Sequence, residues 1–169
     1  KTLLLERASE DFDWSAISPT IFGAVFESTL NPDTRRSGGM HYTSIENIHK
    51  VIDPLFLDGL RAELEEIKEI AVDKTRKAKL KAFQGKLAGL KFLDPACGSG
   101  NFLTETYLSL RKLENEVLRC ITDQISMDLD GIIQVSIGQF YGIEINDFAV
   151  TVAKTALWIA ESQMMKETE

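Results

Sequence analysis

The stretch KFLDPACGSGNFL, Lys91–Leu103, decides how this chain folds. Phe92 and Leu93 form an apolar run that is too short for a helix, and glycines follow at once, which predicts a buried strand entering a tight turn. Glycine suits such a turn because it adopts positive φ and, having no Cβ, lets a ligand approach the backbone. We therefore expect a ligand-binding loop between Asp94 and Gly100, after the carboxyl end of the strand.

A helix and a second strand are expected to follow this loop. Apolar residues recur every three or four positions after Gly100, which predicts a long helix beginning near Asn101. We interpret 121–131 as a loop or irregular insertion, Gln139–Ile145 as a strand, and Asn146-Asp147 as the cap of a final helix. Strand, helix, strand, helix predicts parallel pairing, the opening of a doubly wound α/β sheet.

The residues before Lys91 predict helices. Ser18 and Pro19 are a natural helix start. Thr43 with Glu46 matches a capping box, and the helix that begins there is expected to end near Pro54. The lysine-rich stretch DKTRKAKLK is expected to be a solvated helix face. The first helix has an apolar stripe formed by Ile21, Phe22, Val25, Phe26 and Leu30.

Length and composition favour an ordinary globular protein. The chain has 169 residues, 44% of them hydrophobic and 27% charged, and a net charge of -7. That charge disfavours strong non-specific nucleic-acid binding by this region, because phosphate affinity comes from clustered lysines and arginines. Without a long apolar run or a signal peptide, we expect a cytoplasmic protein, with both ends lying inside a longer polypeptide. Cys97 and Cys120 lack metal-ligand spacing, so no metal site is predicted, and His49 is interpreted as a surface or capping group.

The residues around the glycines narrow the class of ligand. Leu103 stands where a Gly-x-Gly-x-x-Gly dinucleotide loop needs its third glycine, and the Gly-Lys-Ser/Thr of a P-loop is missing. Asp94 would repel a phosphate but suits an ammonium or sulfonium group, while the N-terminus of the next helix suits a carboxylate. These features together predict S-adenosylmethionine as the ligand.

The loop DPACGSGNF resembles the first motif of S-adenosylmethionine-dependent methyltransferases, and its residues are especially similar to those of the adenine-N6 DNA methyltransferases. Upstream, IFGAVFESTL, RRSGGMHYTS and VIDPLFLDGL resemble the lead-in of MmeI-like restriction–modification enzymes, in which methyltransferase and endonuclease share one polypeptide. The resemblance covers about Trp14 to Met164. It implies a Rossmann-like methyltransferase core with a truncated parallel sheet at 91–169. A helical region at 1–90 precedes this core, and its segment 39–46 would close over the cofactor.

The resemblance also implies roles for individual residues. Asp94 would accept a hydrogen bond from the methionine ammonium, and Tyr42 and Thr43 would close over that end of the cofactor. Glu144 would accept from both ribose hydroxyls, and Ile145 would pack on the adenine ring. The loop residues that would wrap the methionine portion are Pro95, Ala96, Cys97, Gly98, Ser99, Gly100, Asn101 and Phe102.

No catalytic residue is expected within the chain. Adenine-N6 methyltransferases use an Asn/Asp-Pro-Pro-Tyr/Phe motif against a flipped-out base, and we expect that motif beyond Glu169. The resemblance thus implies the cofactor-binding part of an enzyme that binds double-stranded DNA in its full-length form. The alternatives are a methyltransferase of RNA or protein glutamine, an inert scaffold of a defence system, and a nicotinamide-dependent oxidoreductase, which Leu103 disfavours.

Overall fold

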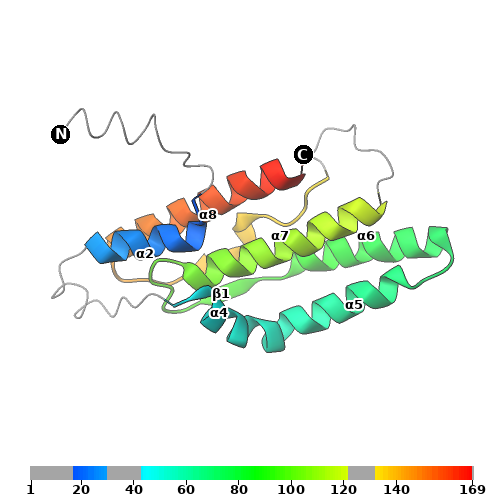
Figure 1. Cartoon of the computed structure of the whole chain (residues 1–169), viewed down its shortest axis with the longest axis horizontal. Helices are drawn as coiled ribbons and strands as arrows, with labels where there is room; N and C mark the ends of the chain where they lie inside the picture. Colours follow the sequence, from blue (N-terminus) through cyan, green and yellow to red (C-terminus); the bar gives the residue numbers. More distant parts are fainter. Residues whose placement is uncertain (1–16, 30–42, 122–131, 169) are drawn as a thin grey trace.

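The computed structural model describes residues 17–29, 43–121 and 132–168, and most of them are helical. Its helices run along the long axis of an elongated molecule (Figure 1). In chain order the elements are α2 (Pro19–Thr29), α4 (Ile45–Ile52), the π-helical turn η2 (Asp53–Leu57), α5 (Asp58–Lys68), α6 (Asp73–Gly89), β1 (Phe92–Asp94), α7 (Asn101–Ile121), the 3-10 turn η4 (Ile137–Gln139), β2 (Phe140–Gly142) and α8 (Asp147–Thr168).

The predicted parallel pairing of the two strands is confirmed. The register pairs Phe92 with Phe140, Leu93 with Tyr141 and Asp94 with Gly142. The rings of Phe92 and Phe140 stack with centroids 5.3 Å apart on the face toward α7, where Tyr107 meets Phe140 edge-on. Leu93 points to the other face and is 63% exposed, so the strand is less buried than predicted. The second strand lies within the predicted segment but is shorter than it.

Helix α7 is the centre of the core. It packs against α8, α6, α4 and α2, and Figure 1 shows it running between α8 and α5. Burying one of its leucines completely contributes about 1.5–3 kcal/mol to folding. The predicted stripe on α7 is confirmed by the buried residues Tyr107, Leu110, Leu113, Val117 and Leu118. The side of α8 that faces the core contains Ala149, Val152, Ala153, Ala156 and Ala160, and Leu157 is partly buried beside them.

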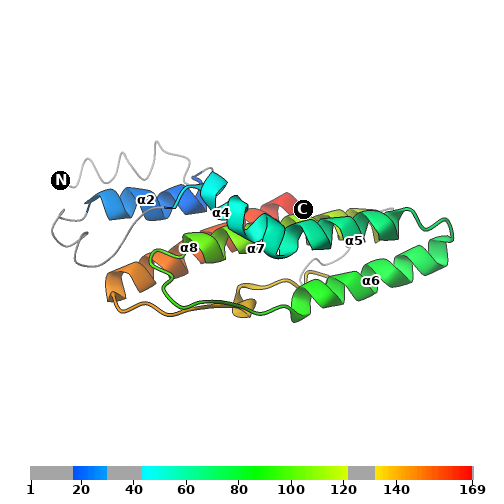
Figure 2. The same cartoon turned by 90° about the horizontal axis from the view of Figure 1, so that it is seen from below.

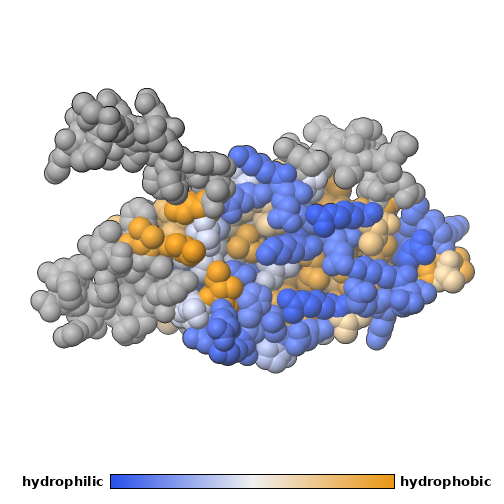
Figure 3. Space-filling model, in the orientation of Figure 1, coloured by the Kyte–Doolittle hydropathy of each residue, from blue (hydrophilic) through white to orange (hydrophobic). Residues whose placement is uncertain are grey.

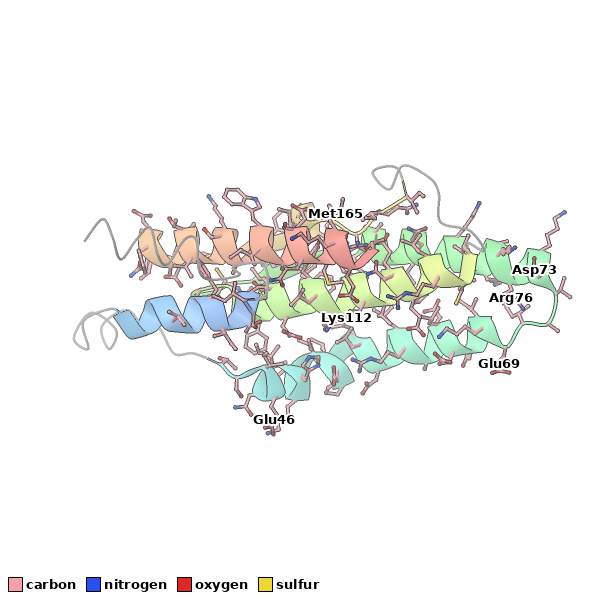
Figure 4. The ribbon with its side chains drawn as sticks, turned by 45° about the horizontal axis from the view of Figure 1, so that its top comes forward. Glu46, Glu69, Asp73, Arg76, Lys112 and Met165 are labelled. Atoms are coloured by element: carbon pink, nitrogen blue, oxygen red, sulfur yellow. The ribbon has the colours of Figure 1, made fainter. Side chains whose placement is uncertain are left out.

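Helices α5 and α6 form an antiparallel hairpin at one end of the molecule (Figure 2). The side of α5 that contains Leu60, Leu64 and Ile67 is buried, as its spacing predicts. Figure 4 shows Asp73 and Arg76 at the turn between the two helices, where their side chains pair at 2.7 Å. The lysines of α6 are largely solvated, as expected, and hydrophilic residues cover much of this face of the hairpin and of α7 (Figure 3).

A buried ion pair lies in the C-terminal half of α7. The side chains of Arg111 and Glu114 are both inaccessible to solvent, and they pair with each other. Glu114 also accepts hydrogen bonds from Gln84 Nε2 at 2.8 Å and from the backbone nitrogens of Gln134 and Val135 at 2.6 and 3.2 Å. This carboxylate therefore ties α6 and the segment before β2 to α7.

The side chain of Gln139 aligns the starts of the two strands. Its Nε2 donates to the carbonyl oxygens of Leu87 and Leu90 at 2.8 and 2.9 Å. Its Oε1 accepts from the backbone nitrogen of Ser136 at 2.9 Å. Because Leu90 lies just before β1 and Gln139 just before β2, this amide fixes where the strands begin to pair.

The first helix starts where predicted but buries a different face. Ser18 Oγ accepts a hydrogen bond from the backbone nitrogen of Ile21 at 3.4 Å. Of the predicted apolar stripe, Ile21 and Val25 are about half exposed, while the side chains of Phe26 and Leu30 lie outside what the structure describes. Small residues lie on the buried side instead, since they let the helix backbone approach its neighbours. That side contains Pro19, Thr20 and Gly23.

The next helix begins one residue later than predicted. Its N-cap is Ser44, whose Oγ accepts from the backbone nitrogen of Asn47 at 3.4 Å, rather than Thr43. Helix α4 ends at Ile52, close to Pro54 as expected, and the chain continues through η2 into α5. Pro54 is the second residue of η2, where the helix changes from α-helical to π-helical spacing.

Candidate ligand-binding site

A cavity of about 650 Å³ lies at the carboxyl ends of β1 and β2. Cavities of roughly 300–1,000 Å³ are typical of small-molecule sites. Three parts of the chain line it: the loop between β1 and α7, the segment after β2, and the wall formed by α4 and η2. In an α/β sheet, ligands bind at this end of the strands.

Nearly all of the predicted site residues within the described ranges meet at this cavity. Gly100 does not line it, and Tyr42 lies outside the described residues. The predicted residues that line it are Thr43, Asp94, Pro95, Ala96, Cys97, Gly98, Ser99, Asn101, Phe102, Glu144 and Ile145.

The two loop glycines have the backbone conformation that the sequence predicts. Gly98 has φ of 51° and Gly100 has φ of 77°, values that strain any residue with a Cβ. Gly100 also lies against α8, because a Cβ there would be 2.8 Å from the Cβ of Ala153. This glycine is therefore required by packing behind the loop rather than by contact with the cavity.

Backbone hydrogen bonds join the loop to the segment after β2. The nitrogen of Ile143 donates to the Asp94 carbonyl at 2.9 Å, and the nitrogen of Cys97 donates to the Ile143 carbonyl at 3.1 Å. The nitrogen of Gly100 then donates to the Cys97 carbonyl at 2.8 Å and closes the turn before α7. The parallel ladder thus continues beyond the strands and shapes the floor of the cavity.

Glu144 holds two backbone segments together at the edge of the cavity. Its Oε2 accepts from the backbone nitrogen of Gly98 at 3.0 Å, and its Oε1 accepts from the nitrogens of Ile145 and Asn146, both at 2.8 Å. A carboxylate has about four acceptor positions. Glu144 therefore keeps some capacity for a ligand while it fixes the loop.

Asp94 brings a further acceptor to the cavity, and Asn101 also lines it. Asp94 Oδ1 accepts from the backbone nitrogen of Ala96 at 3.0 Å, and that carboxylate has no other hydrogen bond from the described part of the chain. Asn101 Oδ1 is buried and has no hydrogen-bond partner among the described residues. Because Asn101 is also the first residue of α7, the free N–H groups of that helix lie at the same place. The site can therefore receive a ligand that carries both hydrogen-bond donors and a carboxylate.

Cys97 is poorly suited to be a nucleophile. Burial, together with the charges of Asp94 and Glu144, raises the pKa of its thiol, which disfavours the reactive thiolate. Its Sγ packs on Gly142, where a Cβ would lie 2.6 Å away. Sequence analysis did not identify Gly142, although a glycine inside a strand pattern is a known sign of close approach.

An apolar wall on the opposite side of the cavity was also not predicted. Val51, Leu55 and Phe56 contribute to it, and the ring of Phe56 lies 5.1 Å from that of Phe92. Leu55 is 73% exposed although it is a large apolar residue. Periodicity could not identify this wall because the π-helical turn rotates these side chains out of the α-helical register. Such turns are frequent at functional sites.

A chain of polar side chains joins the N-terminal helices to α7 beside the cavity. Thr20 Oγ1 donates to Glu105 Oε2 at 3.3 Å, and His49 Nε2 lies 3.1 Å from Glu105 Oε1. His49 Nδ1 lies 2.8 Å from Asp53 Oδ1, and this hydrogen bond is the main reason that the pKa of His49 is raised and that of Asp53 lowered. His49 is therefore a partly buried ion-pair partner, not the surface or capping group that we expected.

The described residues contain neither a group of metal-binding side chains nor a helix suited to span a membrane. In those ranges, His, Cys, Asp and Glu side chains do not gather in groups of three or more that could hold a metal ion. None of the described helices combines the length and apolar character needed to cross a bilayer.

Comparison with known sequences identifies relatives of this chain. Residues 69–169 match the family model of the MmeI DNA-methyltransferase domain. The chain is 43% identical over 164 residues to DNA methyltransferase A of Bacillus subtilis strain 168, which covers 97% of this chain and 18% of that protein. It is 26% identical over 180 residues to a putative type II restriction enzyme and methyltransferase of Methanocaldococcus jannaschii, which covers 94% of this chain and 15% of that protein.

A solved structure agrees with these matches. It is that of the type IIL restriction-modification enzyme MmeI in complex with DNA, with a TM-score of 0.83 and 48% sequence identity. The match covers 93% of this chain and 20% of the solved chain, so this chain spans about a fifth or less of each relative. Because the family model matches more than half of its residues, the chain belongs to the MmeI DNA-methyltransferase domain family.

Proposed function

We propose that this chain binds S-adenosylmethionine and is the cofactor-binding part of a DNA adenine-N6 methyltransferase within a restriction–modification polypeptide. Membership of the MmeI family supports the methyltransferase class. The observation that carries the choice of cofactor is that Asp94, Glu144 and the loop around Gly98 border one cavity at the ends of parallel strands.

The donors and acceptors at this cavity fit the proposed cofactor. Asp94 is proposed to accept from its ammonium group, and the N-terminus of α7 to bind its carboxylate. Glu144 is proposed to accept from the ribose hydroxyls, with Ile145 and the apolar wall packing on the adenine. When bound, S-adenosylmethionine supplies the electrophilic methyl group. The chain's own residues orient it, and orientation is a large part of the acceleration in such transfers.

The chemistry of the cavity argues against ligands that bind through phosphates. Asp94 and Glu144 both line it, and a phosphate beside two carboxylates would be repelled. A nicotinamide dinucleotide therefore suits this site less well than S-adenosylmethionine does.

We further propose that 91–169 is the first half of a Rossmann-like core and that 1–90 is its helical lead-in. The order β1, α7, β2, α8 with parallel pairing supports the first part. Segment 39–46, with Tyr42 and Thr43, is proposed to close over the methionine end of the cofactor. The position of Thr43 at the cavity supports this role.

Double-stranded DNA is the proposed substrate of the intact protein. The related MmeI structure is a complex with DNA. Because this chain has a net charge of -7, we propose that other parts of the protein hold most of the DNA backbone. The catalytic Asn/Asp-Pro-Pro-Tyr/Phe motif is likewise proposed to lie outside this chain.

The test is a methyl-transfer assay with the intact protein. Methyl-labelled S-adenosylmethionine is supplied with double-stranded DNA, with RNA or with a glutamine-containing protein substrate, and the labelled product is hydrolysed and identified. We expect the label in N6-methyladenine from DNA. Label in RNA or in glutamine would contradict the proposed substrate. Binding of the cofactor without any transfer would indicate a scaffold instead of an enzyme.

A further inference from the structure

We infer that helix α2 supports the loop of the proposed cofactor site from behind and that Gly23 is a positioning residue for this loop. This inference rests on the proposed function, because it concerns how the S-adenosylmethionine loop is held. Figure 4 shows α2 lying along α8, with its N-terminal end beside the start of α7, where the loop meets that helix.

The first argument is the closeness of Gly23 to two loop residues. A Cβ at position 23 would lie 3.0 Å from Asn101 Oδ1 and 3.1 Å from both Cβ and Oγ of Ser99. Contacts this short require the neighbouring atoms to move by a few tenths of an ångström. Ser99 and Asn101 are only 3% and 6% exposed, so they have little free space in which to move. The backbone of α2 therefore rests directly on the back of the loop.

The second argument is a hydrogen bond that joins the same faces of α2 and α7 without involving Gly23. Thr20 lies three residues before Gly23, and Glu105 lies four residues after Asn101, spacings that place each pair on one helix face. Thr20 Oγ1 donates to Glu105 Oε2 at 3.3 Å. This hydrogen bond holds α2 in the position that brings Gly23 against Asn101.

A third contact holds the start of α2 to the other side of the fold. Gln163 Nε2 in α8 donates to the carbonyl oxygen of Ile17 at 2.7 Å. Helix α2 is thus attached to α7 and to α8 at separate points. It cannot relieve a crowded Gly23 by moving away without breaking one of these attachments.

The consequence for the ligand comes from Asn101. Asn101 lines the cavity, while its buried Oδ1 lies on the Gly23 side and has no hydrogen-bond partner in the described part of the chain, so packing against Gly23 sets its position. Glycine inside a helix is less favourable than alanine. Alanine would strengthen α2 as an isolated helix, but here its methyl group would push Ser99 and Asn101 toward the cavity.

The test compares glycine-to-alanine substitutions in the intact protein. Gly23→Ala is expected to raise the KM for S-adenosylmethionine roughly 3- to 10-fold, since small displacements of positioning groups weaken binding strongly. The kcat and the thermal midpoint without ligand should stay near those of the unsubstituted protein. Gly59→Ala and Gly85→Ala are matched controls in α5 and α6, because a Cβ at either position meets nothing within 4 Å. Both controls should leave this KM within about twofold.

A second variant, Ser99→Gly, allows the inference to be tested even if Gly23→Ala alone does not fold. Ser99→Gly removes two of the three crowded atoms, so adding Gly23→Ala to it should weaken binding less than in the unsubstituted background. A folded Gly23→Ala protein with an unchanged KM would overturn the inference and leave the proposed function standing. An intact, unsubstituted protein that does not bind S-adenosylmethionine would overturn both.

Discussion

Glu114 in α7 and Asn101 at its N-terminus differ in how their buried side-chain oxygens are satisfied. In the C-terminal half, Glu114 pairs with Arg111 and accepts from three further nitrogen donors, all in the protein. At the N-terminal end, Asn101 Oδ1 has no hydrogen-bond partner among the described residues, and the Asp94 carboxylate next to it in the loop accepts a single backbone bond. Only the N-terminal end borders the cavity.

This difference indicates that Glu114 stabilises the fold, whereas the loop at the N-terminal end of α7 keeps acceptor capacity for a ligand. A buried acceptor without a partner costs about 1–3 kcal/mol. Glu114 has little acceptor capacity left, whereas the Asp94 carboxylate accepts one backbone hydrogen bond and can accept more from a ligand. Thr104 Oγ1, Arg111 Nε and Asn115 Nδ2 also lack partners among the described residues, but none of these residues lines the cavity. We therefore expect substitutions in the C-terminal half to change stability and substitutions in the loop to change binding.

The largest effect is expected for Glu114→Leu. It leaves Arg111 buried without its partner, which lowers the free energy of unfolding by about 3–5 kcal/mol. Urea unfolding measures the change. The double variant Arg111→Met with Glu114→Leu removes both charges, so it should recover the part of the loss that comes from the unpaired arginine, while the three nitrogen donors to Glu114 stay without their acceptor. A single variant as stable as the unsubstituted protein would show that this pair does not support α7.

The next effect is on binding and comes from Asp94→Asn. Losing the charge-assisted hydrogen bond to the cofactor ammonium should cost about 1.5–3 kcal/mol, or roughly 10- to 100-fold in Kd for S-adenosylmethionine. Titration calorimetry measures this Kd. Asp58→Asn is the control, because Asp58 is exposed on α5 and pairs with Arg61 away from the cavity. Equal losses in both variants would contradict a specific role for Asp94.

Gly142→Ala is expected to lower both the free energy of unfolding and the affinity for S-adenosylmethionine, each to a smaller degree. The new methyl group would overlap Cys97 Sγ at 2.6 Å, and overpacking of this kind costs about 1–3 kcal/mol of stability. Cys97 lies in the loop, so cofactor binding should weaken as well. Cys97→Ala in the same protein removes the sulfur and should restore part of both losses. Gly138→Ala is the control, since its Cβ would be at an ordinary 3.5 Å from Ser136 Oγ.

The smallest effect is the pH dependence of the His49 network. The hydrogen bond to Asp53 raises the pKa of His49 above its usual 6.5, so the protonated ring stabilises the folded state. This stabilisation is complete below the unfolded-state pKa and is lost as pH rises through the folded-state pKa. The charged groups facing this network are Asp53, Glu105 and Arg61.

His49→Gln tests this prediction. The difference in unfolding free energy between the unsubstituted protein and His49→Gln should be larger at pH 5.5 than at pH 9, by less than about 1 kcal/mol. Urea unfolding at both pH values measures it. A difference that grows as pH rises would contradict protonation of the folded-state ring.

The parts of the fold that sequence predicted well depend on local chemistry. Gly98 and Gly100 adopt the positive φ that glycine alone accepts easily. Asn146 caps α8 through its Oδ1, which accepts from the backbone nitrogens of Phe148 and Ala149 at 3.0 and 3.1 Å. The loop, the strand before it and the final helix could therefore be predicted from neighbouring residues alone.

The parts that sequence missed depend on contacts between distant residues. The face that α2 buries is decided by Gly23 against Asn101, and hydrophobicity alone favoured the wrong face. The wall at Phe56 depends on its contact with Phe92 and on a π-helical turn that periodicity does not predict. His49 has its role because Glu105, far along the chain, lies beside it.

The most direct test of the account is a crystal structure of the intact protein bound to S-adenosylhomocysteine, the demethylated product. We expect the product in the cavity at the ends of β1 and β2. Its ammonium group should lie within hydrogen-bonding distance of Asp94, and its ribose hydroxyls within that distance of Glu144. A product molecule bound elsewhere, or a cavity that stays empty at saturating product, would contradict the assignment.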